Sequence, residues 1–245
     1  MNIELLDMTR LTILARHFIR TGEWASSLAR NTSVDRRRFR LLADRDGAPF
    51  ETGAAREWLA ELSRRGASDF KLIVPDELDS YERLNRVNGI RCCIICFYDD
   101  RATSFNRLWT LNPVSGKFDV QLVEFPIDRM HEKPVFHDVS ENMTTLLERL
   151  RALAADLRLS EFSFRFTAAL NVLRGKPEGA DVIRPVNSRL LHAASEAYVF
   201  GGKGSWTDVA RRAAEDAGRR EEFEFLTREL YRGIALSVMY AANED

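Results

Sequence analysis

Hydrophobic residues in the centre of the chain follow the spacing of β-strands. After Arg91, residues 92–98 form a continuous run of cysteine, isoleucine and aromatic side chains, which is typical of a strand buried on both faces. Residues 118–125 place apolar side chains at alternate positions, as a half-buried strand does. Between them, residues 105–111 are strand-like, and Asn-Pro-Val-Ser-Gly-Lys at 112–117 has the composition of a turn. The pattern predicts an antiparallel meander of three strands.

On both sides of the meander, apolar residues recur every three or four positions, which is the spacing of one face of a helix. Helices are predicted over residues 4–20, 54–65, 76–87, 141–159, 161–174, 185–200, 207–217 and 219–242. Thr52 and Ser140 are predicted to cap two of these helices. Short strands are predicted over residues 70–74 and beside the basic run at 36–40.

The order of these elements predicts an α+β fold, in which an antiparallel sheet, the meander, is flanked by helices and the C-terminal third is entirely helical. Three segments are expected. Residues 1–53 hold the N-terminal helix and an irregular or strand segment, residues 54–158 form an α+β core, and residues 159–245 form a helical layer or subdomain.

The composition narrows the class of protein. The 245 residues are 45% hydrophobic with a formal net charge of −1, so no bulk electric field draws the chain to nucleic acid or to an anionic membrane. The three cysteines, Cys92, Cys93 and Cys96, share one apolar strand, which does not suit a disulfide framework. No window approaches the roughly 18 apolar residues of a membrane span. We expect a cytoplasmic protein that makes no membrane contact.

The basic run from Arg36 to Arg40 has two interpretations. It is either a nucleic-acid contact or a solvated charged edge of the protein. The near-neutral chain and the absence of interleaved aromatic residues favour the solvated edge. Nucleic-acid binding stays the alternative.

The glycine-rich segment 201–205 resembles a phosphate-binding loop in composition. It departs from the phosphate-loop pattern because Lys203 precedes Gly204 and no strand leads into it. We interpret the segment as the end of one helix, a tight turn and the start of another helix, capped by Ser205 or Thr207.

Neither the cysteines nor the histidines form a convincing metal or redox site. The pair Cys93 and Cys96 lies in mid-strand, where no helix N-terminus lowers a thiol pKa, so core packing is expected. His131 and His137 flank a proline, at a spacing that matches no zinc pairing. No nucleophile motif is present, and we expect no catalytic residue, cofactor or metal.

Acidic residues gather around the predicted meander. Residues 76–138 carry 11 acidic and 8 basic side chains, a net charge of −3. Asp99 and Asp100, with Glu124 and Asp128, could meet at one end of the sheet as metal ligands. Solvated turns, or contacts to a basic protein partner, are the alternatives.

Four features of residues 54–158 occur in a familiar order: Pro75 followed by a predicted helix ending at Asn88-Gly89, then Phe97-Tyr98-Asp99-Asp100, then Leu108–Pro113 with the turn at 115–117, and last the helix from Ser140 through Leu147. In these features residues 54–158 resemble the SUKH superfamily, whose α+β domains include many bacterial immunity proteins against toxins. The family's usual aromatic pair at the start of that last helix is replaced by Glu141-Asn142-Met143, and residues 1–53 and 159–245 lie outside the pattern. Tyr198–Trp206 is also similar to a stretch in other small bacterial proteins, some encoded near toxin genes.

The resemblance implies a non-catalytic cytosolic protein that neutralises a toxin by occluding its active site. If the toxin is a nuclease, its basic groove would attract acidic side chains of the meander: Asp99, Asp100, Asp119, Glu124 and Asp128. The alternative is an enzyme or small-molecule-binding regulator with a pocket between the sheet and the C-terminal helices, rimmed by Lys203, Ser205 and Trp206. The sequence leaves the oligomeric state open.

Overall fold

The computed structural model describes residues 2–43, 49–75, 92–127, 132–175 and 188–244. The chain divides into two compact units. The sheet unit comprises the described residues of 7–73 and 92–135, and the helical unit comprises those of 1–6, 74–91 and 136–245. The predicted α+β fold is confirmed, with a mostly antiparallel open sheet and a helical C-terminal region. The helix predicted over 76–87 and the start of the one predicted over 185–200 lie outside the described residues.

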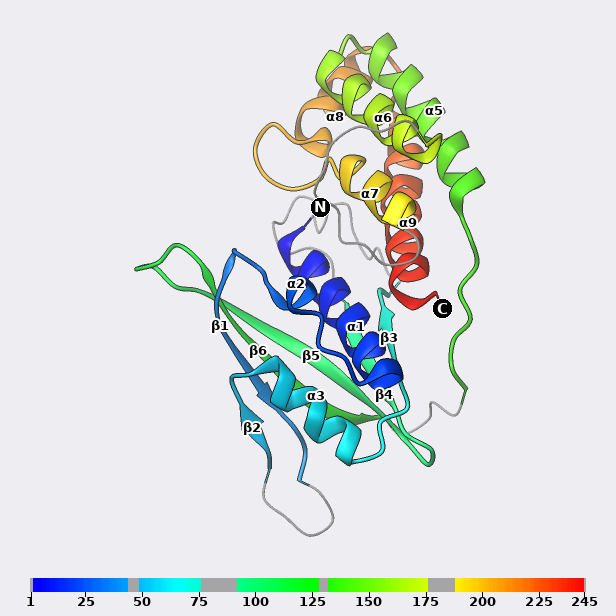
Figure 1. Ribbon diagram of the computed structural model, residues 1–245. Coiled ribbons are helices and arrows are strands. Elements are labelled where there is room, and N and C mark those ends of the chain that lie inside the picture. Colours follow the sequence, from blue (N-terminus) through cyan, green and yellow to red (C-terminus); the bar gives the residue numbers. More distant parts are fainter. Residues whose placement is uncertain (1, 44–48, 76–91, 128–131, 176–187, 245) are drawn as a thin grey trace. The chain divides into compact units, whose positions relative to one another are not determined.

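The sheet has six strands within the described part of the chain. They are β1 (Val34–Arg40), β2 (Glu51–Thr52), β3 (Asp69–Ile73), β4 (Cys93–Phe97), β5 (Ala102–Leu111) and β6 (Phe118–Ile127). Their order across the sheet is β2-β1-β6-β5-β4-β3 (Figure 1). The predicted meander is confirmed as β4, β5 and β6, and the strand predicted at 70–74 is β3, which pairs with β4.

The strand β1 joins the sheet beside β6, in the only parallel pair among the strands that the structure describes. The register places Arg37 opposite Val120 and Phe39 opposite Leu122. The short strand β2 then pairs with the last two residues of β1. The first 53 residues thus supply two strands to the sheet that contains the meander.

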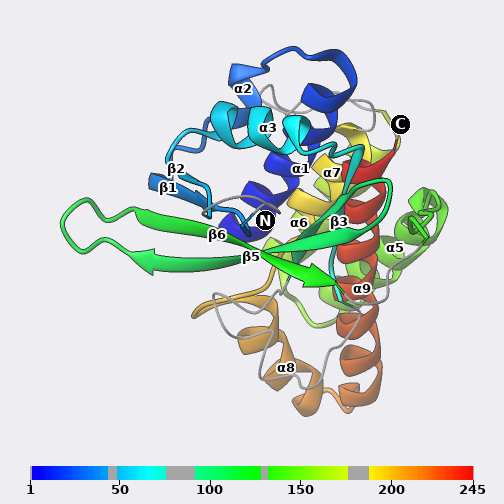
Figure 2. The ribbon, with the colours of Figure 1, turned by 90° about the horizontal axis from the view of Figure 1, so that it is seen from below.

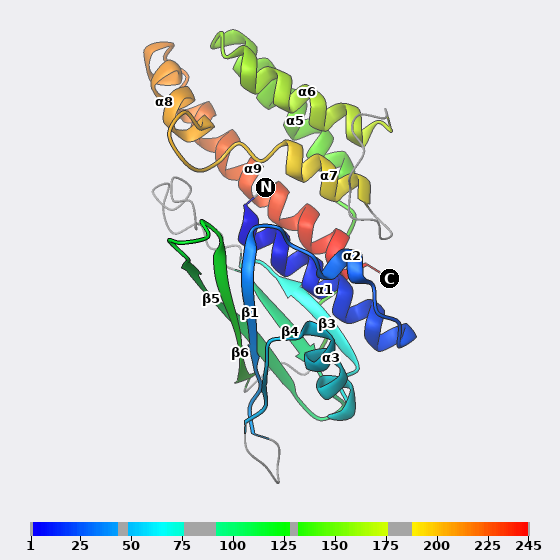
Figure 3. The same ribbon diagram turned by 60° about the vertical axis from the view of Figure 1, so that its left-hand side comes forward.

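The helices of the sheet unit pack on one face of the sheet. These helices are α2 (Ser26–Ala29), α3 (Ala55–Arg64) and the part of α1 (Ile3–Thr21) from Asp7 onward (Figure 3). Trp58 of α3 is fully buried at the centre of this face. Its ring stacks on Phe39 of β1 at 4.6 Å and meets Phe70 of β3 and Phe105 of β5 edge-on at 6.2 and 5.3 Å. Burial of these rings fixes α3 against the sheet.

The hairpin of β5 and β6 is longer than its neighbours. The two strands pair from Ala102 opposite Ile127 to Leu111 opposite Phe118, whereas the register with β4 ends at Phe105 (Figure 2). Asp35 of β1 accepts hydrogen bonds of 3.1 Å from Asn112 Nδ2 and Ser115 Oγ in the connecting turn. These bonds hold the turn beside the start of β1.

The helical unit surrounds a buried tryptophan. Its helices within the described residues are α5 (Ser140–Asp156), α6 (Ser160–Leu173), α7 (Ser188–Glu196), α8 (Trp206–Asp216) and α9 (Arg220–Asn243). Trp206 contacts the rings of Phe162, Phe166 and Phe223 at 5.3–5.4 Å, and its Nε1–H donates a 2.9 Å hydrogen bond to Thr227. Three helices therefore meet at one side chain.

The two predicted helix caps differ in detail from the structure. Thr52 Oγ1 accepts a 3.0 Å hydrogen bond from the N–H of Ala54, the N-cap residue of α3. Ser140 is not a cap but the first residue of α5, and Asp138 Oδ1 accepts hydrogen bonds from both its N–H and its hydroxyl. A carboxylate at the start of a helix also interacts favourably with the helix dipole.

Candidate functional site

The second face of the sheet carries a row of exposed arginines on β1. Arg36, Arg38 and Arg40 point to this face and are exposed, whereas Arg37 and Phe39 point to the helices. Because successive side chains of a strand point to opposite faces, the basic run is divided into three outward arginines and the inward Arg37. We call the surface formed on this face by β1, β6 and the second half of β5 the open face.

Side chains on the open face form three rows across the strands. The strand register gives these rows as Arg36–Asp119–Thr110, Arg38–Gln121–Leu108 and Arg40–Val123–Asn106. Phe125 lies beyond the third row on β6. Because each row runs through paired β-strands, the backbone fixes the spacing of its side chains.

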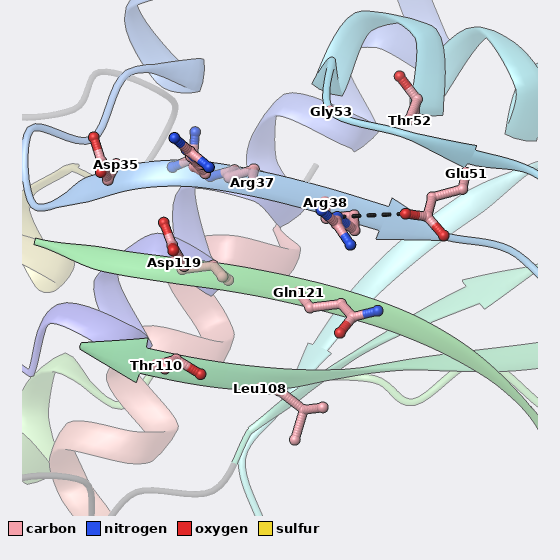
Figure 4. Close-up of a pocket in the computed structure, with 12 residues that line it drawn as sticks. Asp35, Arg37, Arg38, Glu51, Thr52, Gly53, Leu108, Thr110, Asp119 and Gln121 are labelled. Carbon is pink, nitrogen blue, oxygen red and sulfur yellow. Dashed lines mark ion pairs between the residues drawn. The ribbon is translucent and has the colours of Figure 1, made fainter. Parts of the chain in front are cut away.

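A shallow hollow of about 820 Å³ lies over the first two rows (Figure 4). Figure 4 shows Arg38, Gln121 and Leu108 projecting from adjacent strands on this side of the sheet. Arg38 Nε lies 3.3 Å from Glu51 Oε1 of β2, and the two side chains are 67% and 48% exposed. An ion pair so exposed contributes little to stability, so both groups are accessible to another molecule.

The open face combines charge, amides and apolar side chains. Within the described residues, Arg36 and Arg40 form no ion pair, and Asp119 Oδ1 is enclosed without a hydrogen-bond partner. Leu108 is 63% exposed and Phe125 is 45% exposed. Exposed apolar residues beside arginines are typical of surfaces that bind other proteins.

The acidic residues predicted to bind a partner do not form one surface. Asp99 and Asp100 are exposed in the turn before β5, whereas Asp119 is opposite Thr110, at the other end of the hairpin. Thr110 is eight positions after Ala102 along β5, or about 26 Å at roughly 3.3 Å per residue. Asp128 lies outside the described residues.

Glu124 belongs to the interior and not to an acidic surface. Its side chain is 3% exposed and points to the face that carries the helices. Its carboxylate accepts hydrogen bonds from Thr103 Oγ1 at 2.7 Å, Tyr98 Oη at 3.2 Å and the Leu42 N–H at 2.9 Å. With both oxygens occupied by these donors, Glu124 joins β6 to β5, to the residue that follows β4 and to the segment that follows β1.

The proposed ligand rim is also largely internal. Trp206 is fully buried and Ser205 is 8% exposed, with its hydroxyl 3.1 Å from that of Thr207. Lys203 alone of the three is exposed. The N–H of Gly204 donates to Asp208 Oδ2 at 2.8 Å, so an acidic side chain of α8 already occupies this end of the helix. The predicted turn at 201–204 is confirmed, with positive φ at Gly201, Gly202 and Gly204.

Cys93 and Cys96 lie in β4 and Cys92 immediately precedes it, in agreement with the core-packing interpretation. Cys92 and Cys96 are buried, Cys93 is half-buried, and burial raises the pKa of both the Cys93 and the Cys96 thiol. A raised thiol pKa disfavours the reactive thiolate. Among the residues that the structure describes, no three His, Cys, Asp or Glu side chains are arranged to hold a metal ion. His137 is exposed, and His131 is not among the described residues.

A second hollow, of about 470 Å³, lies between α5 and α9 in the helical unit. Gly233 of α9 permits the close approach, because an added Cβ would lie 3.1 Å from Met143 Sδ and 3.3 Å from Leu146 Cδ2. The Arg149 guanidinium lies 5.4 Å from the centre of the Phe225 ring at the edge of this hollow.

The helices in the described part of the chain include none with the length and the apolar character of a membrane-spanning segment.

No family model matches the chain, and no curated protein or solved structure is significantly similar to it. The resemblance of residues 54–158 to the SUKH superfamily therefore stays a prediction. The sequence singles out the run from Arg36 to Arg40, but it is interpreted there as a solvated edge. The alternation in β1, which turns Phe39 inward and Arg38 outward, is the signal in the sequence that points to the open face.

Proposed function

We propose that this chain is a non-catalytic, cytosolic binding protein that neutralises a bacterial toxin by occluding the toxin's active site, and that it contacts the toxin with the open face. The observation that carries this proposal is the row of Arg36, Arg38 and Arg40 beside the exposed Leu108 and Phe125. Arginine and aromatic residues are enriched at protein interfaces and supply much of their binding energy.

A sheet face suits this role because its side chains are held by a rigid scaffold. The strands beneath the open face are anchored by Trp58 and the rings around it, so little conformational entropy is lost on binding. The resemblance to immunity proteins supports a toxin as the partner. If the toxin is a nuclease with a basic groove, Asp99 and Asp100 are the acidic residues that would contact that groove, since Glu124 is internal and Asp119 lies at the far end of the hairpin.

The test combines capture with rescue of growth. The full chain is tagged and co-expressed with the products of neighbouring genes, and a stoichiometric partner is identified by mass spectrometry. We expect a partner that stops growth when expressed alone and permits growth with this chain. A partner that is harmless alone, or no partner, contradicts the toxin proposal.

Variants of exposed residues then test which surface of the chain contacts the toxin. Replacing Arg36, Arg38 and Arg40 together by glutamine should abolish rescue, whereas the same change at Arg151, Arg212 and Arg228 should not. The control arginines are also exposed, and they lie on helices of the other unit. If instead Asp99→Arg with Asp100→Arg abolishes rescue and the open-face variant does not, the turn before β5 is the contact surface.

A further inference from the structure

The spacing and charge of the arginine row define the kind of segment that fits it. We propose that the open face receives an extended, acidic segment of the protein partner, with carboxylates at alternate positions that pair with Arg36, Arg38 and Arg40. This inference rests on the proposed function, because it names the chemistry of the partner at the same surface.

The geometric argument begins with the repeat along β1. Side chains two residues apart on one face of a strand are about 6.6 Å apart. An extended segment repeats its own side chains at the same interval, so carboxylates at alternate positions meet successive arginines without distortion. A helical segment brings side chains to one face about every 5.4–6 Å, which is shorter than the repeat of β1, and successive side chains four residues apart also turn around the helix axis, so a helix fits this row less well over three contacts.

The charge argument concerns which arginines are available. Arg36 and Arg40 form no ion pair within the described residues, and Arg38 has only an exposed contact with Glu51. A carboxylate brought to this row can form bidentate hydrogen bonds with a guanidinium. The neighbouring Gln121 and Asn106 can bond the backbone of the segment, since each offers both a donor and an acceptor.

The same surface is less suited to nucleic acid. Among the residues that the structure describes, Phe125 is the only aromatic one on the open face, and it lies beyond the third row. A single-stranded nucleic acid is normally bound by several stacking rings along a basic groove.

The experiment uses two synthetic peptides with the full chain. One has twelve residues in which threonine and glutamate alternate, and the other has the same composition as three repeats of Glu-Glu-Thr-Thr, so that each face of the extended peptide carries a carboxylate only at every fourth residue. Binding is measured by fluorescence anisotropy at low salt. We expect the alternating peptide to bind at least about threefold more tightly, because its carboxylates reach all three arginines in register.

Matched variants connect the binding to the row. Replacement of Arg36, Arg38 and Arg40 by glutamine should remove the preference, and the same change at Arg151, Arg212 and Arg228 should preserve it. Circular dichroism and a thermal melt establish that each variant is folded. Equal affinity for the two peptides, or a preference that survives the open-face variant, overturns the inference. Tighter binding of a twelve-nucleotide oligothymidylate by the open face overturns it in favour of nucleic acid.

The outcomes separate this inference from the proposed function. If a captured toxin loses its affinity for the open-face variant but the peptides show no preference, the face binds the toxin by other chemistry and only the inference fails. If the peptides show the preference and no toxin is found, the toxin proposal fails while the acidic ligand stands.

Discussion

Thr103 Oγ1 donates a 2.7 Å hydrogen bond to Glu124 Oε1 across the strands β5 and β6, on the face of the sheet that the helices cover. The same carboxylate receives the hydroxyl of Tyr98 and the backbone N–H of Leu42. Glu124, which the sequence suggested as a partner contact, is therefore a buried hydrogen-bond acceptor inside the sheet unit. The arginine row of β1 lies on the opposite face of the sheet.

The internal role of Glu124 predicts a large effect on stability. Glu124→Ala removes the acceptor of the buried Thr103 and Tyr98 hydroxyls and of the partly buried Leu42 N–H, so we expect the free energy of unfolding to fall by about 2–4 kcal/mol in urea denaturation. Glu51→Ala is the control, because its exposed pair with Arg38 should contribute less than about 1 kcal/mol. Equal stability of the two variants would show that Glu124 is not the internal acceptor described above.

Trp206 predicts a contrast with Lys203. Trp206→Ala removes a fully buried ring from among three phenylalanines and should lower the free energy of unfolding by about 3–5 kcal/mol. Lys203→Ala changes an exposed side chain and should lie within about 0.5 kcal/mol of the parent. Chemical denaturation measures both. A small effect of Trp206→Ala would return this residue to the ligand rim inferred from the sequence.

The buried ion pair between Asp7 and Arg37 links α1 to β1. Asp7 is fully buried, and its Oδ1 accepts from Arg37 Nη2 and, at 2.8 Å, from Asn31 Nδ2. Asp7→Ala leaves a buried cation unpaired and should lower the free energy of unfolding by about 3–5 kcal/mol. The double variant Asp7→Leu with Arg37→Met should recover much of this loss, because it removes both charges. A double variant less stable than the single one would contradict this account.

Glu61 predicts a stability change in acid. Hydrogen bonds from Arg64, and then from Arg65, lower the pKa of Glu61 from 4.5 to about 2. Because the folded pKa is the lower one, the stabilisation is complete above about pH 4.5 and is lost as the pH falls toward 2. The parent should therefore lose up to about 1 kcal/mol more than Glu61→Gln over this range, a value limited by solvent screening. Parallel pH profiles of the two proteins would exclude the shift.

The sequence predicts the individual helices and strands well, because each is indicated by the spacing of apolar residues within a short segment. The alternation over 118–125 predicts β6, and the spacing of Trp58, Leu59 and Leu62 predicts α3. The pairing of β1 with β6 is different. These two parallel strands are about eighty residues apart in the sequence, and no local pattern in Arg36–Arg40 predicts that this segment pairs with Phe118–Val123.

The candidate site shows the same limit. Alternate residues of a strand point to the same face. Glu124 therefore shares the inward face of Leu122, and Arg38 points to the face opposite Phe39, so the sequence alone predicts the orientation of both side chains. It does not predict the contacts of Trp206. Phe162 and Phe166 lie about forty residues before Trp206 and Phe223 lies on the next helix, and only the packing of these helices shows that Trp206 is internal.

The most direct test of the account is the affinity of the captured toxin for the parent chain and for the variant with Arg36, Arg38 and Arg40 replaced by glutamine, measured by isothermal titration calorimetry. We predict a loss of at least about tenfold in the variant, with no change when Arg151, Arg212 and Arg228 are replaced instead. Equal affinity of the parent and the open-face variant would contradict the claim that the open face is the binding surface.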